Sequence, residues 1–129
     1  FANQPESRDR EDGLELRDAW VSASVRCAPP DNKPLREEIA ACRPFLEREL
    51  AAMLRVRVVV ALGRLAFDNY LAGRRLGLVF AHDAEHRLPG EGEPVLISSY
   101  HPSQQNTSTG KLTEPMLRAV FERARRLIE

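Results

Sequence analysis

Residues 56–62 constrain the fold more than any other stretch of this sequence. They read Val-Arg-Val-Val-Val-Ala-Leu, a nearly continuous apolar run that Gly63 ends. Such a run is typical of a parallel strand that is buried on both faces of a sheet. Residues 94–98, after the turn cluster at 89–93, are expected to form a second core strand, and residues 19–26 a weaker third one. Strands that alternate with helical patterns predict an α/β domain with three α/β/α layers and a central parallel sheet.

Helical periodicity fills the stretches between these strands. Pro44 is expected to break the first of them, because a proline ring clashes with the carbonyl four residues earlier. This gives a short helix that ends near Ala41 and a second helix over residues 44–54. A further helix is expected over residues 64–72. The last helix begins after Thr113, a favourable N-cap, and continues to the end of the chain with its apolar residues on one face.

The composition describes one small domain of ordinary polarity. The formal net charge is zero, from 19 basic and 19 acidic residues, so the simplest argument for nucleic-acid binding, a strongly basic domain, is absent. A local basic rim can still coexist with a neutral total. No apolar run approaches the roughly 18 residues that a membrane span needs, and we expect a cytoplasmic monomer without a membrane partner. Half of residues 1–18 are charged, and this stretch is expected to form an exposed N-terminal segment of a single domain over residues 1–129.

Two polar loops follow predicted strands. One contains His101 and continues to Lys111; the other covers residues 27–33. In open α/β sheets, ligands bind where the strands end at their carboxyl edge. Both loops are therefore candidates for a functional site. On polarity alone, a solvated surface loop with an incidental histidine stays open as an alternative.

The cysteines and the remaining histidines carry weaker signals. Cys27 and Cys42 are too few for a disulfide framework, and two buried structural thiols are the alternative to a ligand role. His82 and His86 would be neighbours if their segment were helical, but no third metal ligand is evident, so we interpret them as ordinary polar residues. Residues 78–81 before them predict a short strand or a packed loop.

A long motif directly follows the strand at residues 94–98. Residues 99–113 read Ser-Tyr-His-Pro-Ser-x-x-Asn-Thr-x-Thr-Gly-x-Leu-Thr. His-Pro-Ser after a strand resembles the third motif of the uracil-DNA glycosylase superfamily, and the longer pattern resembles family 5 of that superfamily in particular.

A second and independent match lies earlier in the chain. Residues 25–34 and 42–46 resemble the segment of families 4 and 5 that supplies two cysteine ligands to a 4Fe–4S cluster. The resemblance implies that Cys27 and Cys42 are those ligands, and in these families the other two cysteines lie N-terminal to this region. A third, weaker match is Val-Ala-Leu-Gly at residues 60–63. Family 4 enzymes carry an asparagine at the place of Ala23, which favours family 5.

The resemblance implies a DNA repair glycosylase. Such an enzyme flips a nucleotide out of double-stranded DNA and cleaves the N-glycosidic bond of uracil, leaving an abasic site; family 5 also tolerates other deaminated bases. By resemblance His101 donates a hydrogen bond to the uracil O2, where negative charge develops. Asn32 is the second catalytic candidate, for the base edge or for a positioned water, and its alternative role is to cap the following helix.

The resemblance also implies contacts with the duplex. Gln104 and Gln105 are expected to enter the minor groove and fill the gap left by the flipped base. Lys33 and Lys111 flank the site and are candidates for phosphate contacts, with solvated lysines as the alternative. The predicted DNA-binding residues are Ser103, Gln104, Gln105, Asn106, Lys111 and Lys33.

The superfamily's first motif, a Gly-rich strand and loop, has no counterpart in these residues. The chain therefore looks like the C-terminal part of such an enzyme, whose first strand would lie inside the sheet. The alternative is an inactive fragment that retains only a DNA-binding surface. We expect residues 1–129 alone to lack glycosylase activity, because the motif that faces His101 and two of the four cluster cysteines are missing.

Overall fold

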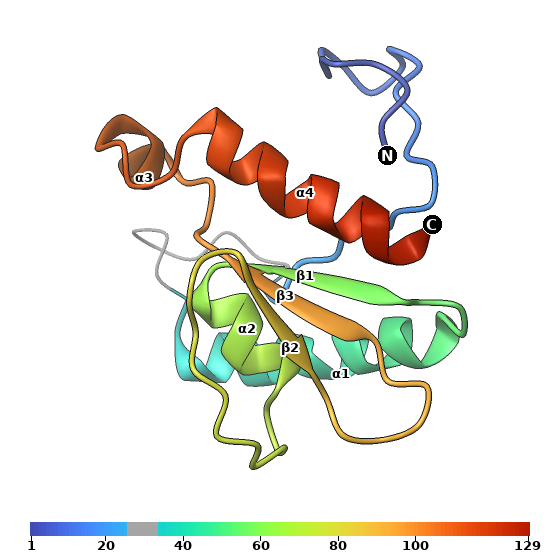
Figure 1. Ribbon diagram of the computed structural model, residues 1–129, viewed down its shortest axis with the longest axis vertical. Helices are drawn as coiled ribbons and strands as arrows, with labels where there is room; N and C mark the ends of the chain where they lie inside the picture. The colour runs from blue at the N-terminus through green and yellow to red at the C-terminus, as the bar shows by residue number, and fades with distance from the viewer. Residues whose placement is uncertain (26–33) are drawn as a thin grey trace.

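The computed structural model describes residues 1–25 and 34–129 (Figure 1). Their helices and strands follow a simple order. This order is α1 (Arg36–Ala52), β1 (Val58–Leu62), α2 (Arg64–Tyr70), β2 (Ala84–Arg87), β3 (Val95–Ser99), α3 (Gln104–Ser108) and α4 (Glu114–Ile128). None of the described helices is long and apolar enough to cross a membrane.

The three strands form one mixed sheet in the order β1-β3-β2. β1 runs parallel to β3, with Val60 opposite Ile97, as the two apolar runs predicted. β2 pairs with β3 in the antiparallel direction, so the prediction of a wholly parallel sheet is wrong for this strand. The reason is the short turn between the two strands, because a parallel partner needs a crossover of a dozen or more residues.

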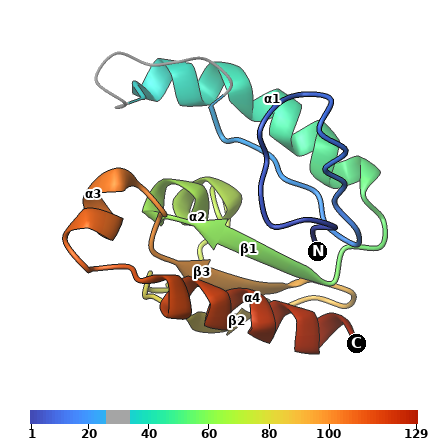
Figure 2. The same ribbon diagram turned by 90° about the horizontal axis from the view of Figure 1, so that it is seen from above.

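Helices cover both faces of the sheet, which gives the three expected layers (Figure 2). On one face Ala61 of β1 and Leu96 of β3 pack with Phe67 of α2. On the other face Ile97 of β3 packs with Val120 and Ala124 of α4. The apolar residues of β1 and β3 alternate between these two clusters, which explains why their sequences carry no polar face.

The predicted first strand and the predicted helix break are both wrong. Residues 19–25 form no strand in the structure, and Trp20 is 68% exposed. α1 continues through Pro44 without interruption. Ala40 and Pro44 both lie on the exposed side of the helix, where the carbonyl that loses its hydrogen bond can reach water. A proline is tolerated more easily there than in a buried helix.

Two other predicted elements match the structure closely. The helix predicted over residues 64–72 is α2, which ends slightly earlier. α4 begins after Thr113, whose hydroxyl accepts a hydrogen bond from the Met116 amide at 3.4 Å. Residues 78–81 form a loop, one of the two predicted outcomes, and β2 begins three residues later.

Candidate active site

The carboxyl ends of β1 and β3 meet where the sequence predicted a site. The amide of Gly63, directly after β1, donates to the carbonyl of Ser99 at 2.8 Å. His101 follows two residues later, and its side chain lies against Gly63. A Cβ atom added to Gly63 would be 3.1 Å from the Cβ of His101. A side chain at residue 63 would therefore require His101 to move by a few tenths of an ångström.

The backbone of His101 is fixed by its own loop. Its carbonyl oxygen accepts hydrogen bonds from the Ser103 amide at 2.8 Å and from the Asn106 side-chain amide at 2.9 Å. The side chain is exposed, and its ring nitrogens form no hydrogen bond with the residues that the structure describes. The imidazole is thus held at its base while its ring nitrogens remain available to a ligand.

Part of the predicted polar loop is a short helix. The Ser103 hydroxyl caps α3 by accepting a hydrogen bond from the Asn106 amide at 3.2 Å. The hydroxyls of Thr107 and Thr109 donate to carbonyls one turn earlier, Ser103 at 2.9 Å and Gln105 at 2.8 Å. Ser103 and Asn106 therefore hold the loop together, and their contacts with DNA stay a prediction.

The other side chains predicted to contact DNA lie at the surface of this loop. Gln104 and Gln105 occupy the first turn of α3, and both are exposed. Lys111 is exposed as well, with its Nζ atom 4.7 Å from the centre of the Tyr100 ring. Next to it, the buried Leu112 anchors the returning chain to the core. The loop thus presents two amides and one ammonium group, and hydrogen bonds and the buried Leu112 hold its backbone.

Two histidines that the sequence did not mark as functional support the end of β3. They are not a helical pair, because His82 lies in a loop and His86 lies in β2. His86 contacts the hydroxyl of Ser98 at 3.1 Å through Nε2. Nδ1 of His82 accepts a hydrogen bond from the Tyr100 amide at 3.1 Å. The signal for these partners was present in the two buried serines at the end of the strand, because buried hydroxyls need hydrogen bonds.

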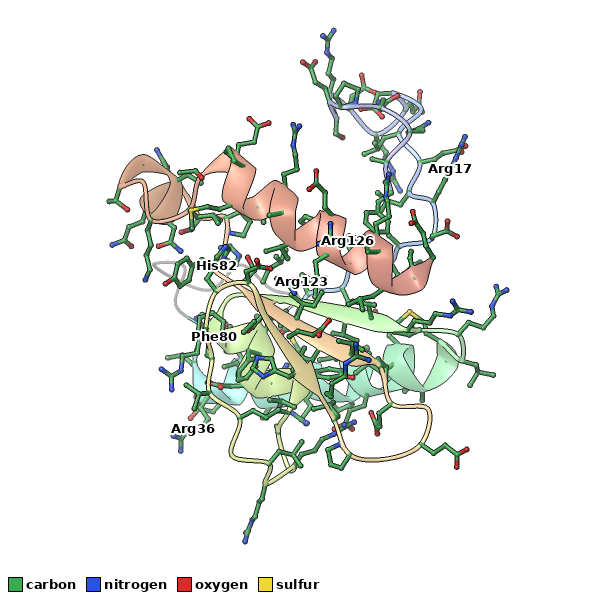
Figure 3. The ribbon with its side chains drawn as sticks, in the orientation of Figure 1. Arg17, Arg36, Phe80, His82, Arg123 and Arg126 are labelled. Carbon is green, nitrogen blue, oxygen red and sulfur yellow. The ribbon has the colours of Figure 1, made fainter. Side chains whose placement is uncertain are left out.

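An ion pair fixes the segment that carries these histidines. Arg123 of α4, which is labelled in Figure 3, contacts both carboxylate oxygens of Asp83, at 3.0 and 3.3 Å. This hydrogen bond and the charge of Asp83 raise the pKa of Arg123 above its usual value. Asp83 adopts a φ of 54°, which few non-glycine residues do. The chain around His82 is therefore attached to α4.

The predicted cluster ligands are only partly described. Cys42 lies half-buried in α1, whereas Cys27, Asn32 and Lys33 lie outside the described residues. The proximity of Cys27 and Cys42 therefore stays a prediction. Among the described residues no group of three or more histidine, cysteine or acidic side chains could hold a metal ion. A 4Fe–4S cluster takes four thiolates and this chain has two cysteines, so these residues do not by themselves fit the cluster.

The chain belongs to the uracil-DNA glycosylase superfamily. Its sequence matches the profile of that superfamily over residues 4–125. A type-5 uracil-DNA glycosylase from Thermus thermophilus is 45% identical to it over 98% of the chain, and one from Pyrobaculum aerophilum is 40% identical over 96%. A type-4 uracil-DNA glycosylase from Pyrobaculum aerophilum is 32% identical over 86%.

Two points follow from these relatives. Identity to type-5 enzymes exceeds identity to a type-4 enzyme, as the motif at residues 99–113 and Ala23 predicted. The chain spans about half the length of the curated relatives that it matches, 58% and 54% of the two type-5 enzymes. The similarity therefore covers only a part of each relative.

Proposed function

We propose that this protein is a DNA repair glycosylase, which cleaves the N-glycosidic bond of uracil and of other deaminated bases in double-stranded DNA and leaves an abasic site. One observation carries the proposal. The backbone of His101 is fixed between Gly63 and α3, at the carboxyl edge of the sheet, while its ring has no partner among the described residues. This is the arrangement that a donor to a flipped base requires.

In this proposal His101 acts on the leaving group. As the bond between C1′ and the base breaks, negative charge moves onto the base and its O2 oxygen. Either ring nitrogen of an imidazole that carries a proton can donate to that oxygen. One donor of this type raises the rate by about 10²–10³-fold in a site from which water is excluded. Asn32 is the second proposed catalytic residue, acting on the base edge or on the attacking water.

The loop after His101 is the proposed contact with the duplex. Gln104 and Gln105 project from the first turn of α3 and would fill the space left by the flipped nucleotide from the minor groove. Lys111 and Lys33 would contact phosphates. The net charge of zero favours few such contacts, so we expect a shallow dependence of the binding constant on salt. Each phosphate contact contributes about 0.9 to the slope of log K against log salt.

Cys27 and Cys42 are the proposed cluster ligands of this chain. Their thiolates would fill two of the four positions of a 4Fe–4S cluster, whose contribution would be structural. No step of the reaction proposed for His101 involves the cluster. Iron content of the chimera that is used below for the reaction, together with its loss in Cys42→Ser, tests this assignment separately from the reaction.

The reaction is tested with a chimera and with the chain itself. In the chimera, residues 1–129 replace the matching segment of the Thermus thermophilus relative. We expect single-turnover excision of uracil from a duplex by the chimera and no excision by residues 1–129 alone. His101→Ala in the chimera should lower the excision rate about 100-fold or more, with little change in affinity for a duplex that contains an abasic-site analogue.

A matched control separates binding from catalysis. The double variant Gln104→Ala and Gln105→Ala should weaken duplex binding and leave the iron content unchanged. If the chimera binds the duplex as tightly as the relative but does not excise uracil, the alternative of a DNA-binding surface without catalysis is supported. If His101→Ala excises uracil at the rate of the unmodified chimera, His101 is not the donor.

A further inference from the structure

We propose that His82 is a positioning residue for His101: it holds the Ser99–Tyr100 peptide, one peptide before the residue that carries the imidazole. The inference rests on the role of His101 proposed above. It adds a residue from a different part of the chain, the loop before β2, to the machinery that holds the leaving-group donor.

His82 contacts Tyr100 through both the backbone and the ring. The Tyr100 amide, one residue before His101, donates to Nδ1 of His82 at 3.1 Å. A backbone amide can only donate, so Nδ1 must lack a proton, and in a neutral ring Nε2 carries it. The rings of His82 and Tyr100 are also stacked, with 4.8 Å between their centres and 25° between their planes.

Tyr100 is in contact with the far end of the same loop. Lys111 places its Nζ atom 4.7 Å from the centre of the Tyr100 ring, a distance at which an ammonium group is attracted to an aromatic face. Tyr100 therefore contacts His82 from the loop before β2 and Lys111 from the chain that returns after α3. A change in its position would change both ends of the loop that carries His101.

His82 can act as a support because its neighbours are fixed. Asp83 forms the two-oxygen contact with Arg123 of α4, and the Ala81 carbonyl accepts a hydrogen bond from the buried Ser98 hydroxyl at 2.6 Å. Both neighbours of His82 are thus attached, one to the last helix and one to the central strand. Figure 3 shows His82 beside the connection from β3 to α3.

Two substitutions separate the hydrogen bond from the ring. His82→Asn keeps an acceptor, because Oδ1 of asparagine occupies the place of Nδ1, and removes the stacked ring. His82→Phe keeps a stacked ring and removes the acceptor. If His82 only fills space, His82→Phe should preserve activity better than His82→Asn. If its hydrogen bond positions the backbone, His82→Asn should preserve activity better.

The excision rate of the chimera is the first readout. We expect His82→Phe to lower the single-turnover rate about tenfold or more, because small displacements of a reacting group reduce rates strongly. His82→Asn should stay within about threefold of the unmodified chimera, and both should bind an abasic-site duplex normally. The proposal is overturned if His82→Phe retains the full rate, or if His82→Asn is the more damaged of the two.

Nuclear magnetic resonance of the unmodified 129-residue chain gives a second readout that needs neither a variant nor activity. We expect a scalar coupling between the Tyr100 amide nitrogen and Nδ1 of His82, and slow exchange of that amide with solvent. A protonated Nδ1 in the folded protein would overturn the proposal. A chimera that does not excise uracil would instead refute the proposed function, and the coupling would still decide whether His82 holds Tyr100.

Discussion

The part of the molecule from β1 to α4 and the part before it are stabilised in different ways. Every buried residue in the described chain lies between Ala61 and Ala124. α1 has no buried residue, and two apolar side chains before β1 are strongly exposed, Trp20 at 68% and Leu54 at 91%. The part from β1 to α4 has a hydrophobic core on both faces of the sheet, whereas α1 contributes no buried side chain to a core.

Polar contacts take the place of a core at α1. The Arg43 guanidinium donates to the Asn69 side-chain oxygen at 2.8 Å and to two carbonyls of the α2 segment, Asn69 and Ala72, at 3.0 and 3.3 Å. The Trp20 indole donates to Glu49 at 3.3 Å. Such bonds contribute about 0.5–3 kcal/mol each, so we expect α1 to open more easily than the sheet.

The proposed chemistry divides along the same boundary. His101, its supports Gly63 and His82, and the glutamines of α3 all belong to the part with the core. Cys42 belongs to α1. A leaving-group donor must be held with little motion, and the buried sheet provides that. We therefore expect substitutions in the part with the core to lower the unfolding free energy more than substitutions in α1.

The largest difference is expected from one substitution made on each side. Leu96→Ala in β3 removes a side chain with 0% exposure and should lower the free energy of unfolding by about 2–5 kcal/mol. Leu46→Ala in α1 removes a half-buried side chain and should cost about 1 kcal/mol or less. Urea denaturation followed by far-UV circular dichroism measures both. Equal losses would show that α1 shares the core of the sheet.

Gly63→Ala tests the contact between β1 and His101. Its φ of 98° and ψ of 161° lie in a region that only glycine adopts readily, and the new Cβ would meet His101 at 3.1 Å. We expect a loss of about 1–3 kcal/mol in unfolding free energy together with slower excision by the chimera. Gly73→Ala is the matched control, since Gly73 has a φ of 82° but no neighbour within 4 Å. If chimeras with either variant excise uracil at the same rate, the close approach of residue 63 to His101 does not affect excision.

The sequence predicted the part with the core much better than the part before it. The apolar runs at β1 and β3, the N-cap Thr113 and the one-sided pattern of α4 each depend on local chemistry that a sequence displays directly. Residues 19–25 carry a strand pattern as well, but a strand needs a partner, and no pattern within one segment reveals whether a partner is present. The direction of β2 and the continuity of α1 through Pro44 depended on context in the same way.

The same distinction applies to the site. The sequence located His101 and the polar loop, because the motif is continuous along the chain. It did not reveal that Ser103 and Asn106 form hydrogen bonds within the loop, or that His82 contacts Tyr100. These are contacts between side chains and backbone that depend on the folded path. Sequence reasoning therefore named the residues of the loop more reliably than it assigned their partners.

A smaller effect is expected at the contact between α1 and α2. Arg43→Ala should lower the unfolding free energy by about 1–2 kcal/mol, because it leaves the buried oxygen of Asn69 without its donor. Hydrogen exchange should show faster opening of α1 amides and unchanged protection in β3. Arg48→Ala is the control from the same helix, where the guanidinium contacts the Pro44 carbonyl at 3.3 Å and the Phe45 ring, both within α1. Uniform loss of protection across the sheet would mean that α1 and the sheet unfold as one unit.

The smallest effect is expected at alkaline pH from Tyr70, at the end of α2. Burial raises the pKa of the Tyr70 hydroxyl above its usual value near 10, and the nearby Arg74 guanidinium opposes this shift. A group whose pKa is higher in the folded state stabilises the fold fully below its unfolded pKa and loses that contribution as the pH rises through the folded pKa. The protein should therefore lose stability above about pH 10, and Tyr70→Phe should lose less over the same range. Urea midpoints at pH 7 and at several values above 10 measure the difference. Similar midpoints at pH 7 would show that the substitution leaves packing intact, and parallel decline of both proteins above pH 10 would exclude Tyr70 as the titrating group.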